Sequence, residues 1–262
     1  SLSTRGILLI MSNSAGPITK KIDKLIKSMD DSTQSQEEQK ERPTQPEQDP
    51  SEFDITKPYR VVVREGNQGG AEKLVIENFD VDNLKLKDNE LLIDIHASGI
   101  NFIDTYHRSG LYPNVYQLGK EGGGIITNIG AKVDNYAVGD KVCWFSIQGS
   151  YATHIVTTND NIGLMKIPDS LFKLYENDEE AVFDLGASVG IQALTAHYLC
   201  RSLFPVNNQT SVLVHAGAGG TGGLLIQICK HVLKSPLVIC TVGSEEKKKI
   251  ALEYGADHAI LY

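Results

Sequence analysis

The sequence predicts an α/β protein in which a β-barrel-like first domain is followed by the beginning of a doubly wound parallel sheet. Two observations lead to this prediction. Before Pro168, short strand-like segments alternate with glycine turns, which is typical of a barrel. After Pro168, strands alternate with helices, and a glycine-rich turn over residues 216–223 follows the first of these strands.

Composition narrows the functional classes. The chain has 262 residues, of which 41% are hydrophobic and 22% charged, as in globular proteins of one large or two ordinary domains. A net charge of -8 argues against nucleic-acid binding through bulk charge. The longest early apolar run, residues 6–11, is far shorter than the roughly 20 residues that cross a bilayer, so no membrane partner is expected.

Cysteine spacing gives no sign of a structural metal or of a disulfide framework. No two cysteines form a CxxC pair, and all four lie far apart in the sequence. Reduced thiols in an intracellular compartment are therefore expected. The four are Cys143, Cys200, Cys229 and Cys240.

Residues 1–56 are expected to form a disordered extension. Residues 18–29 carry apolar side chains at helical spacing, which predicts a transient helix in a loose tail. Residues 30–54 have almost no large apolar side chain and cannot offset the entropy of ordering. Four lysines within residues 1–29 leave a mitochondrial presequence open, but such segments favour arginine and only Arg5 is present. We therefore expect a cytoplasmic protein, with a mitochondrial one as the alternative.

The first ordered domain is expected over residues 57–185. Short β-rich segments are separated by turn residues, including a turn over 85–90. The expected strands lie at residues 60–63, 91–97, 122–126 and around 142.

The second domain is expected over residues 186–262, where strands and helices alternate. Pro236 ends one helix, and Ser244 caps a charged helix that runs to Gly255. After Pro168 the expected elements are a helix at 179–185, which still belongs to the first domain, a helix at 191–203, a strand at 211–215, a helix at 224–233, and strands at 237–242 and 258–262. This is the start of an open parallel sheet, and the strands that would complete it do not follow. We expect the chain to be poorly stable and inactive alone.

The glycine turn, AGAGGTGG over residues 216–223, indicates a dinucleotide site. Glycines between a strand and a helix permit a tight turn, a close approach to a pyrophosphate and close helix packing. The helix N-terminus offers free N–H groups to the phosphates. No Lys-Ser or Lys-Thr pair stands in the turn, which argues against a triphosphate loop. A glycine-rich connection in another kind of α/β protein is the alternative.

The end of the second strand favours NADPH over NADH. NAD sites usually place a carboxylate there, but this strand ends without one at Val242 and Gly243. Ser244 can donate a hydrogen bond, and three lysines at 247–249 suit a 2′-phosphate. The alternative is a solvated lysine face, consistent with the adjacent Glu245 and Glu246.

Several segments together resemble a known family. The matching pieces are GINFIDTYHRSGLYP at 99–113, LGKEGGG at 118–124, VGDKV at 138–142, Gly190, LTA at 194–196, the glycine turn, and Gly255 with Ala256. Over residues 57–262 the chain resembles the zeta-crystallin-type quinone oxidoreductases of the medium-chain dehydrogenase/reductase superfamily, truncated at the C-terminus. The resemblance implies a GroES-like β-barrel domain and an incomplete Rossmann domain, with NADPH in the cleft between them. It also implies a homodimer for the full-length protein.

The resemblance also implies roles for individual residues. Asn101 and Thr195 would face the nicotinamide half of the cofactor. The pyrophosphate would lie on Gly219, Gly220, Thr221 and Gly222. The 2′-phosphate would be held by Ser244, Lys247 and Tyr262. The quinone region would be lined by Asn101, Asp104, Tyr106 and Tyr112.

The same segments predict that no metal is bound. In the zinc alcohol dehydrogenases of this superfamily a cysteine stands at the position of Asn101 and a histidine at that of Lys120. Glu121 remains, but one carboxylate does not make a tetrahedral site. Without the resemblance, the alternative for Asn101 is a turn residue that bonds its own backbone.

The implied reaction is hydride transfer from NADPH to a small-molecule quinone, with a proton from solvent or a nearby hydroxyl. Tyr112 is the candidate for a hydroxyl that contacts the acceptor, and one-electron reduction stays open. One rival is a zinc-free reductase of enoyl thioesters or α,β-unsaturated ketones. The other is a non-enzymatic NADPH-binding or RNA-binding role, as known for crystallins of the family.

Overall fold

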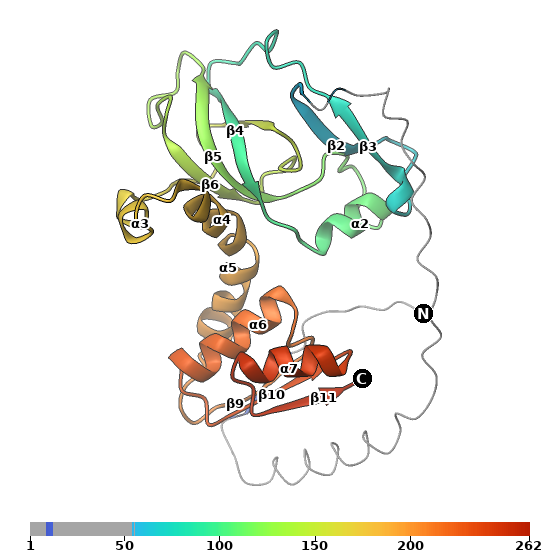
Figure 1. Cartoon of the computed structure of the whole chain (residues 1–262), viewed down its shortest axis with the longest axis vertical. Helices are drawn as coiled ribbons and strands as arrows, with labels where there is room; N and C mark the ends of the chain where they lie inside the picture. Colours follow the sequence, from blue (N-terminus) through green and yellow to red (C-terminus); the bar gives the residue numbers. More distant parts are fainter. Residues whose placement is uncertain (1–8, 13–53, 55) are drawn as a thin grey trace. The chain divides into compact units, whose positions relative to one another are not determined.

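The computed structural model describes residues 9–12, 54 and 56–262, which belong to two compact units (Figure 1). One unit is Arg42–Ile191, called the barrel unit below, and the other combines Ser1–Glu41 with Gln192–Tyr262, called the dinucleotide unit. The helix expected at 18–29 and nearly all of the disorder expected at 30–54 lie outside the described residues. The expected domain boundary between residues 185 and 186 falls inside a helix, whereas the two units divide after Ile191.

The barrel unit is built on antiparallel strands. Its main sheet has the order β7-β4-β5-β6-β8, and a smaller one pairs β2 with β3. Single bridges from Arg60 to Ala152 and from Val62 to Gln117 join β2 to chain beside the main sheet. The strands are β2 (Tyr59–Val63), β3 (Leu74–Asn78), β4 (Glu90–Ser98), β5 (Glu121–Ile129), β6 (Lys141–Phe145), β7 (His154–Thr158) and β8 (Leu164–Lys166).

Alternating side chains from the main sheet form the barrel core. Leu91 and Ile93 on β4, Ile126 on β5 and Trp144 on β6 are fully buried together. A second cluster lies under helices α3 (Asp169–Leu174) and α4 (Glu179–Val189). The short helices η2 (Ala71–Lys73) and α2 (Ile103–Ser109) were not expected from the sequence. The expected strands are confirmed, and so is the barrel architecture.

The dinucleotide unit alternates strands and helices as expected. Three parallel strands, β9 (Ser211–Val214), β10 (Leu237–Val242) and β11 (His258–Leu261), lie side by side in that order. Figure 1 shows α6 and α7 on the same side of these strands. The helical segments are α5 (Gln192–His197), the π-helical η3 (Tyr198–Leu203), α6 (Gly220–Gln227), the π-helical η4 (Ile228–Val232) and α7 (Glu245–Glu253).

Two details of this unit differ from expectation. Helix α6 begins at Gly220, four residues before the expected start, because the glycines of the turn themselves form the first helical turn. Strand β1 (Leu9–Ser12) pairs antiparallel with β9, from Leu9 opposite Val214 to Ser12 opposite Ser211. Its backbone pairs with the outer edge of β9, so the sheet is mixed rather than purely parallel.

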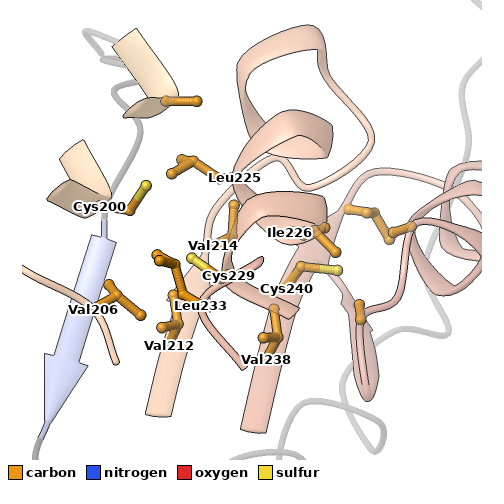
Figure 2. Close-up of a cluster of buried hydrophobic side chains, with 14 residues drawn as sticks. Cys200, Val206, Val212, Val214, Leu225, Ile226, Cys229, Leu233, Val238 and Cys240 are labelled. Atoms are coloured by element: carbon orange, nitrogen blue, oxygen red, sulfur yellow. The ribbon is translucent and has the colours of Figure 1, made fainter. Parts of the chain in front are cut away.

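Figure 2 shows the core of the dinucleotide unit, where β9 and β10 pack against α6 and η4. Its largest fully buried side chains are Leu225 and Ile226 on α6. Burial of each such side chain stabilises the fold by about 1.5–3 kcal/mol. Within the described part of the chain, no helix is long and apolar enough to cross a membrane.

Candidate functional site

The glycine turn is held tightly between β9 and α6. The Gly217 N–H donates to the Thr241 carbonyl on β10 over 2.9 Å, and the Gly219 N–H to the Ala216 carbonyl over 2.9 Å. Ala216 has a φ of 56°, the left-handed region, which costs a residue with a Cβ about 1–2 kcal/mol. The strain is localised at the point where the chain leaves the strand.

Four of the five glycines of the turn fall into two pairs with different duties. Gly219 and Gly220 are exposed, so their backbone is open to a ligand. Gly222 and Gly223 are buried; a Cβ on Gly222 would collide with the Ala216 carbonyl oxygen, and one on Gly223 would lie 2.7 Å from the Tyr254 ring. The first pair allows approach, and the second allows close packing.

The N-terminus of α6 can receive an anion. Its N-cap residue is Gly219, which has no side chain to accept hydrogen bonds from the amides of the first turn. The amides of Gly220 and Thr221 therefore stand at the positive end of the helix dipole, as a pyrophosphate requires. The Gln192 side chain lies against Gly220, since a Cβ there would collide with its Oε1. Sequence reasoning missed Gln192, and no motif would have marked it.

Ser244, Lys247 and Tyr262 gather where β10 and β11 end. Ser244 is the N-cap of α7 and accepts from the Lys247 N–H over 3.2 Å. A serine hydroxyl that accepts in this way keeps its own proton to donate. The Tyr262 N–H donates to the Val242 carbonyl over 3.2 Å, which holds this residue at the tip of β10.

The charges around this tip favour an anion. Lys247 is exposed, and among the described residues it is Lys248 that pairs with Glu245, at 3.8 Å. The Tyr262 ring is half exposed and lies 5.0 Å, centroid to centroid, from the His215 ring. Thr195 lies in the same unit, half-buried on α5, which packs against α6.

Asn101 lies in the barrel unit, where a carboxylate holds its side chain. Its Nδ2 donates to Glu121 Oε1 over 2.6 Å, and both residues are buried. The other oxygen of Glu121, Oε2, accepts from the Ile191 backbone N–H over 2.6 Å. The side chain of Asn101 thus bonds to a distant strand, and the alternative of a self-bonding turn residue does not describe this contact.

Asp104 is buried in a second such arrangement. Its Oδ1 accepts from the Gly119 N–H over 3.0 Å and its Oδ2 from the Tyr151 hydroxyl over 2.9 Å. Burial and the neighbouring Asp104 carboxylate raise the pKa of Tyr151 well above its usual range. Nothing in the sequence indicated a role for Tyr151. Both oxygens of Asp104 accept hydrogen bonds from other segments of the chain, so we assign Asp104 a structural role.

Aromatic rings cover the exposed side of α2. The Tyr106 ring lies 5.4 Å from the Phe102 ring and 5.3 Å from the Tyr112 ring, both edge to face. Phe102 and Tyr112 are largely exposed. This edge offers a surface for a planar acceptor, and the Tyr112 hydroxyl belongs to it.

The expected site residues therefore fall into one group in each unit. The barrel unit holds Asn101, Asp104, Tyr106 and Tyr112, and the dinucleotide unit holds Thr195, Gly219, Gly220, Thr221, Gly222, Ser244, Lys247 and Tyr262. Lys120 and Glu121, on which the expectation of no zinc rests, also lie in the barrel unit. In residues 9–12, 54 and 56–262 no three His, Cys, Asp or Glu side chains are placed to hold a metal ion.

Comparison with known proteins identifies similar proteins for both units. The family model of the Alcohol dehydrogenase GroES-like domain matches residues 87–169. The mouse protein Quinone oxidoreductase is 36% identical over 197 residues, which cover 72% of this chain and 54% of that protein. In sequence and in fold the chain is similar to the quinone oxidoreductases. The crystal structure of the Escherichia coli quinone oxidoreductase complexed with NADPH superposes with a TM-score of 0.65 at 30% identity, covering 78% of this chain and 58% of that one.

Relatives of other function also match. The reducing polyketide synthase hmp8 of Hypomyces subiculosus is 37% identical over 171 residues, 65% of this chain but 7% of that protein. The chain spans about half the length of the curated quinone oxidoreductases it matches, 54% of the mouse protein among them. The fold is shown for this chain, and these similarities confirm the resemblance on which the expected fold rested.

Proposed function

We propose that this chain belongs to an NADPH-dependent oxidoreductase that reduces quinones without zinc. The observation that carries the proposal is the pairing of an uncapped, glycine-lined helix N-terminus with a strand end that bears Ser244 and Lys247 and no carboxylate. The first suits a pyrophosphate and the second suits a 2′-phosphate. Relatives that include the Escherichia coli quinone oxidoreductase complexed with NADPH support the same cofactor.

The residues of each unit have distinct duties in this proposal. Bound NADPH supplies the hydride, and the protein orients the cofactor and excludes water. The amides of Gly220 and Thr221 hold the pyrophosphate, while Ser244 and Lys247 hold the 2′-phosphate. Asn101 and Thr195 face the nicotinamide. In this proposal the protein positions the reactants and is not required to supply acid–base catalysis.

The residues that we expect to contact the acceptor suit a quinone. The rings of Tyr106 and Tyr112 form an exposed aromatic edge that can pack against a planar ring. No strong general acid is needed, since a reduced quinone oxygen is a comparatively stable anion. This agrees with an Asp104 whose two oxygens are already bonded. The Tyr112 hydroxyl, on the exposed edge, can contact the acceptor oxygen.

Reduction of enoyl thioesters is the second candidate function. The match to a reducing polyketide synthase at 37% identity favours it. It would use the same cofactor residues, and the two functions differ in the acceptor alone. The aromatic edge on α2 favours a flat ring over a flexible acyl chain.

Steady-state turnover separates the two functions. The purified protein is given NADPH with either 1,4-naphthoquinone or crotonyl-CoA, and NADPH oxidation is followed by absorbance. We expect kcat/KM for the quinone to be greater by on the order of tenfold or more, about 1.4 kcal/mol in transition-state stabilisation. A greater kcat/KM for crotonyl-CoA would assign the thioester activity. NADPH binding without turnover of either acceptor would favour a non-enzymatic role.

A further inference from the structure

Glu121 is a buried carboxylate at the start of β5, and the family resemblance gave it no duty. Its side chain is completely buried. Burial of a carboxylate costs several kcal/mol unless donors compensate for lost water. Its two oxygens therefore need partners, and each has a different one: Asn101 Nδ2 at 2.6 Å and the Ile191 N–H at 2.6 Å.

Two glycines make room for this carboxylate. A Cβ on Gly99 would collide with the Glu121 side chain, and one on Gly190 would lie 3.0 Å from its Oε2. Each glycine stands close before one of the two donors, Asn101 and Ile191. The chain on both sides is thus shaped to bring an N–H group onto the carboxylate.

Each of the two bonds has a functional consequence. A carboxylate accepts hydrogen bonds and does not donate them, so only the Nδ2 end of the Asn101 amide can bond to Glu121. The same bond therefore fixes the direction in which the Oδ1 end points. Ile191 is the last residue of the barrel unit, and Gln192, which lies against Gly220 of the phosphate-binding turn, comes next. One side chain therefore restrains both Asn101 and the peptide that leads into the dinucleotide unit.

We propose that Glu121 is a positioning residue. It sets the orientation of the Asn101 side chain and links Asn101 to Ile191, the residue at which the chain leaves the barrel unit. The proposal rests on the proposed function only where Asn101 is taken to face the nicotinamide. The restraint itself is a property of this chain and can be measured without cofactor.

The first test is amide hydrogen exchange by NMR in Glu121→Gln. The amide that replaces the carboxylate keeps one acceptor oxygen, so one of the two donors loses its partner. We expect the Ile191 amide to exchange faster by on the order of tenfold relative to the Val142 amide in the same unit, and the Asn101 side-chain resonances to shift. The control is Glu77→Gln. Glu77 lies on β3, is half-exposed and pairs with Arg60, so this substitution should change neither the exchange of the Ile191 amide nor the Asn101 resonances.

The second test is NADPH affinity in Asn101→Ala, Glu121→Gln and the double variant. If Glu121 acts through Asn101, the double variant binds no more weakly than the worse single variant. Additive losses, or an unchanged Ile191 amide together with unchanged Asn101 side-chain resonances, would overturn the proposal. An Asn101→Ala variant of normal affinity with a fast Ile191 amide in Glu121→Gln would instead refute the nicotinamide role and leave the restraint supported.

Glu121→Asp keeps the measurement available if Glu121→Gln does not fold. It retains the charge, but its side chain is shorter by one methylene and cannot reach both donors. We expect the same pattern of exchange from it, and normal exchange at Ile191 together with unchanged Asn101 side-chain resonances would count against the proposal in the same way.

Discussion

At the scale of single residues, the barrel unit buries two carboxylates and gives each of their four oxygens a donor. Glu121 receives Asn101 and Ile191, and Asp104 receives Gly119 and Tyr151. Hydrogen bonds to charged groups contribute about 1.5–3 kcal/mol each. Both carboxylates join segments far apart in the chain, so they stabilise the arrangement of the site more than any one element.

His107 on α2 should make the stability of this region depend on pH. Burial and the charge of Lys120 lower its pKa from 6.5, against weaker opposing effects of the Tyr112 backbone and Asp104. Above pH 6.5 the ring is neutral in the folded and unfolded chains, and stability is full. As pH falls through that value the unfolded chain takes up a proton first, so the free energy of unfolding decreases until the folded pKa is reached.

Urea unfolding of the wild type and His107→Gln at pH 7.5 and 5.5 measures this effect. We expect a smaller loss of stability on acidification in His107→Gln, because that side chain does not titrate. The rest of the chain is the same in both proteins, so its contribution to the pH dependence cancels in the comparison. Identical pH dependence in the two proteins would show that His107 is not the group responsible.

The sequence identified some of these residues and could not identify others. Asn101 and Lys120 stood out because a related family places metal ligands at their positions. Glu121 was visible, but its partners lie 20 and 70 positions away, and no spacing rule reaches that far. Tyr151 is bonded to Asp104 across 47 positions and had no signal for the same reason.

At the scale of elements, the glycine turn predicts opposite results for two similar substitutions. Gly222→Ala places a methyl group against the Ala216 carbonyl, where backbone must move, and should destabilise the protein by about 1–3 kcal/mol. Gly219→Ala meets only that carbonyl, at 3.2 Å, and should cost less than about 1 kcal/mol. Its methyl group would instead stand on the exposed side, where the pyrophosphate approaches.

Chemical denaturation and NADPH titration of both variants check this division. Gly219→Ala should unfold almost as the wild type does and bind NADPH more weakly by on the order of tenfold. Gly222→Ala should unfold earlier. A Gly219→Ala variant with unchanged affinity would show that the pyrophosphate does not lie on this turn.

The elements of the dinucleotide unit were easier to predict than those of the barrel unit. Apolar strands bounded by Gly or Pro, and the Ser244 cap, are strong local signals. Helix α2 has seven residues and no side-chain cap at Phe102, so it gave no such signal. The antiparallel pairing of β1 with β9 places Leu9 opposite Val214, far away in the sequence, and a local sequence pattern contains no information on such a pairing.

At the scale of the whole molecule, the chain combines a barrel unit with a unit suited to phosphates, and both are similar to the corresponding parts of quinone oxidoreductases. Zinc independence, a quinone acceptor, a homodimer and a cytoplasmic location stay predictions. The proposed function requires a dinucleotide site that selects the 2′-phosphate. We expect that selection to depend most on Lys247, since it is exposed and its backbone amide bonds to Ser244, the N-cap that follows β10.

Fluorescence titration of NADPH and NADH at fixed ionic strength tests this requirement directly. We expect NADPH to bind more tightly than NADH by on the order of tenfold or more, and Lys247→Glu to remove most of that preference. Lys249→Glu is the matched control, because side chains two positions apart on a helix face different directions. Equal affinity for the two cofactors, or equal effects of the two substitutions, would contradict an NADPH site built on Ser244 and Lys247.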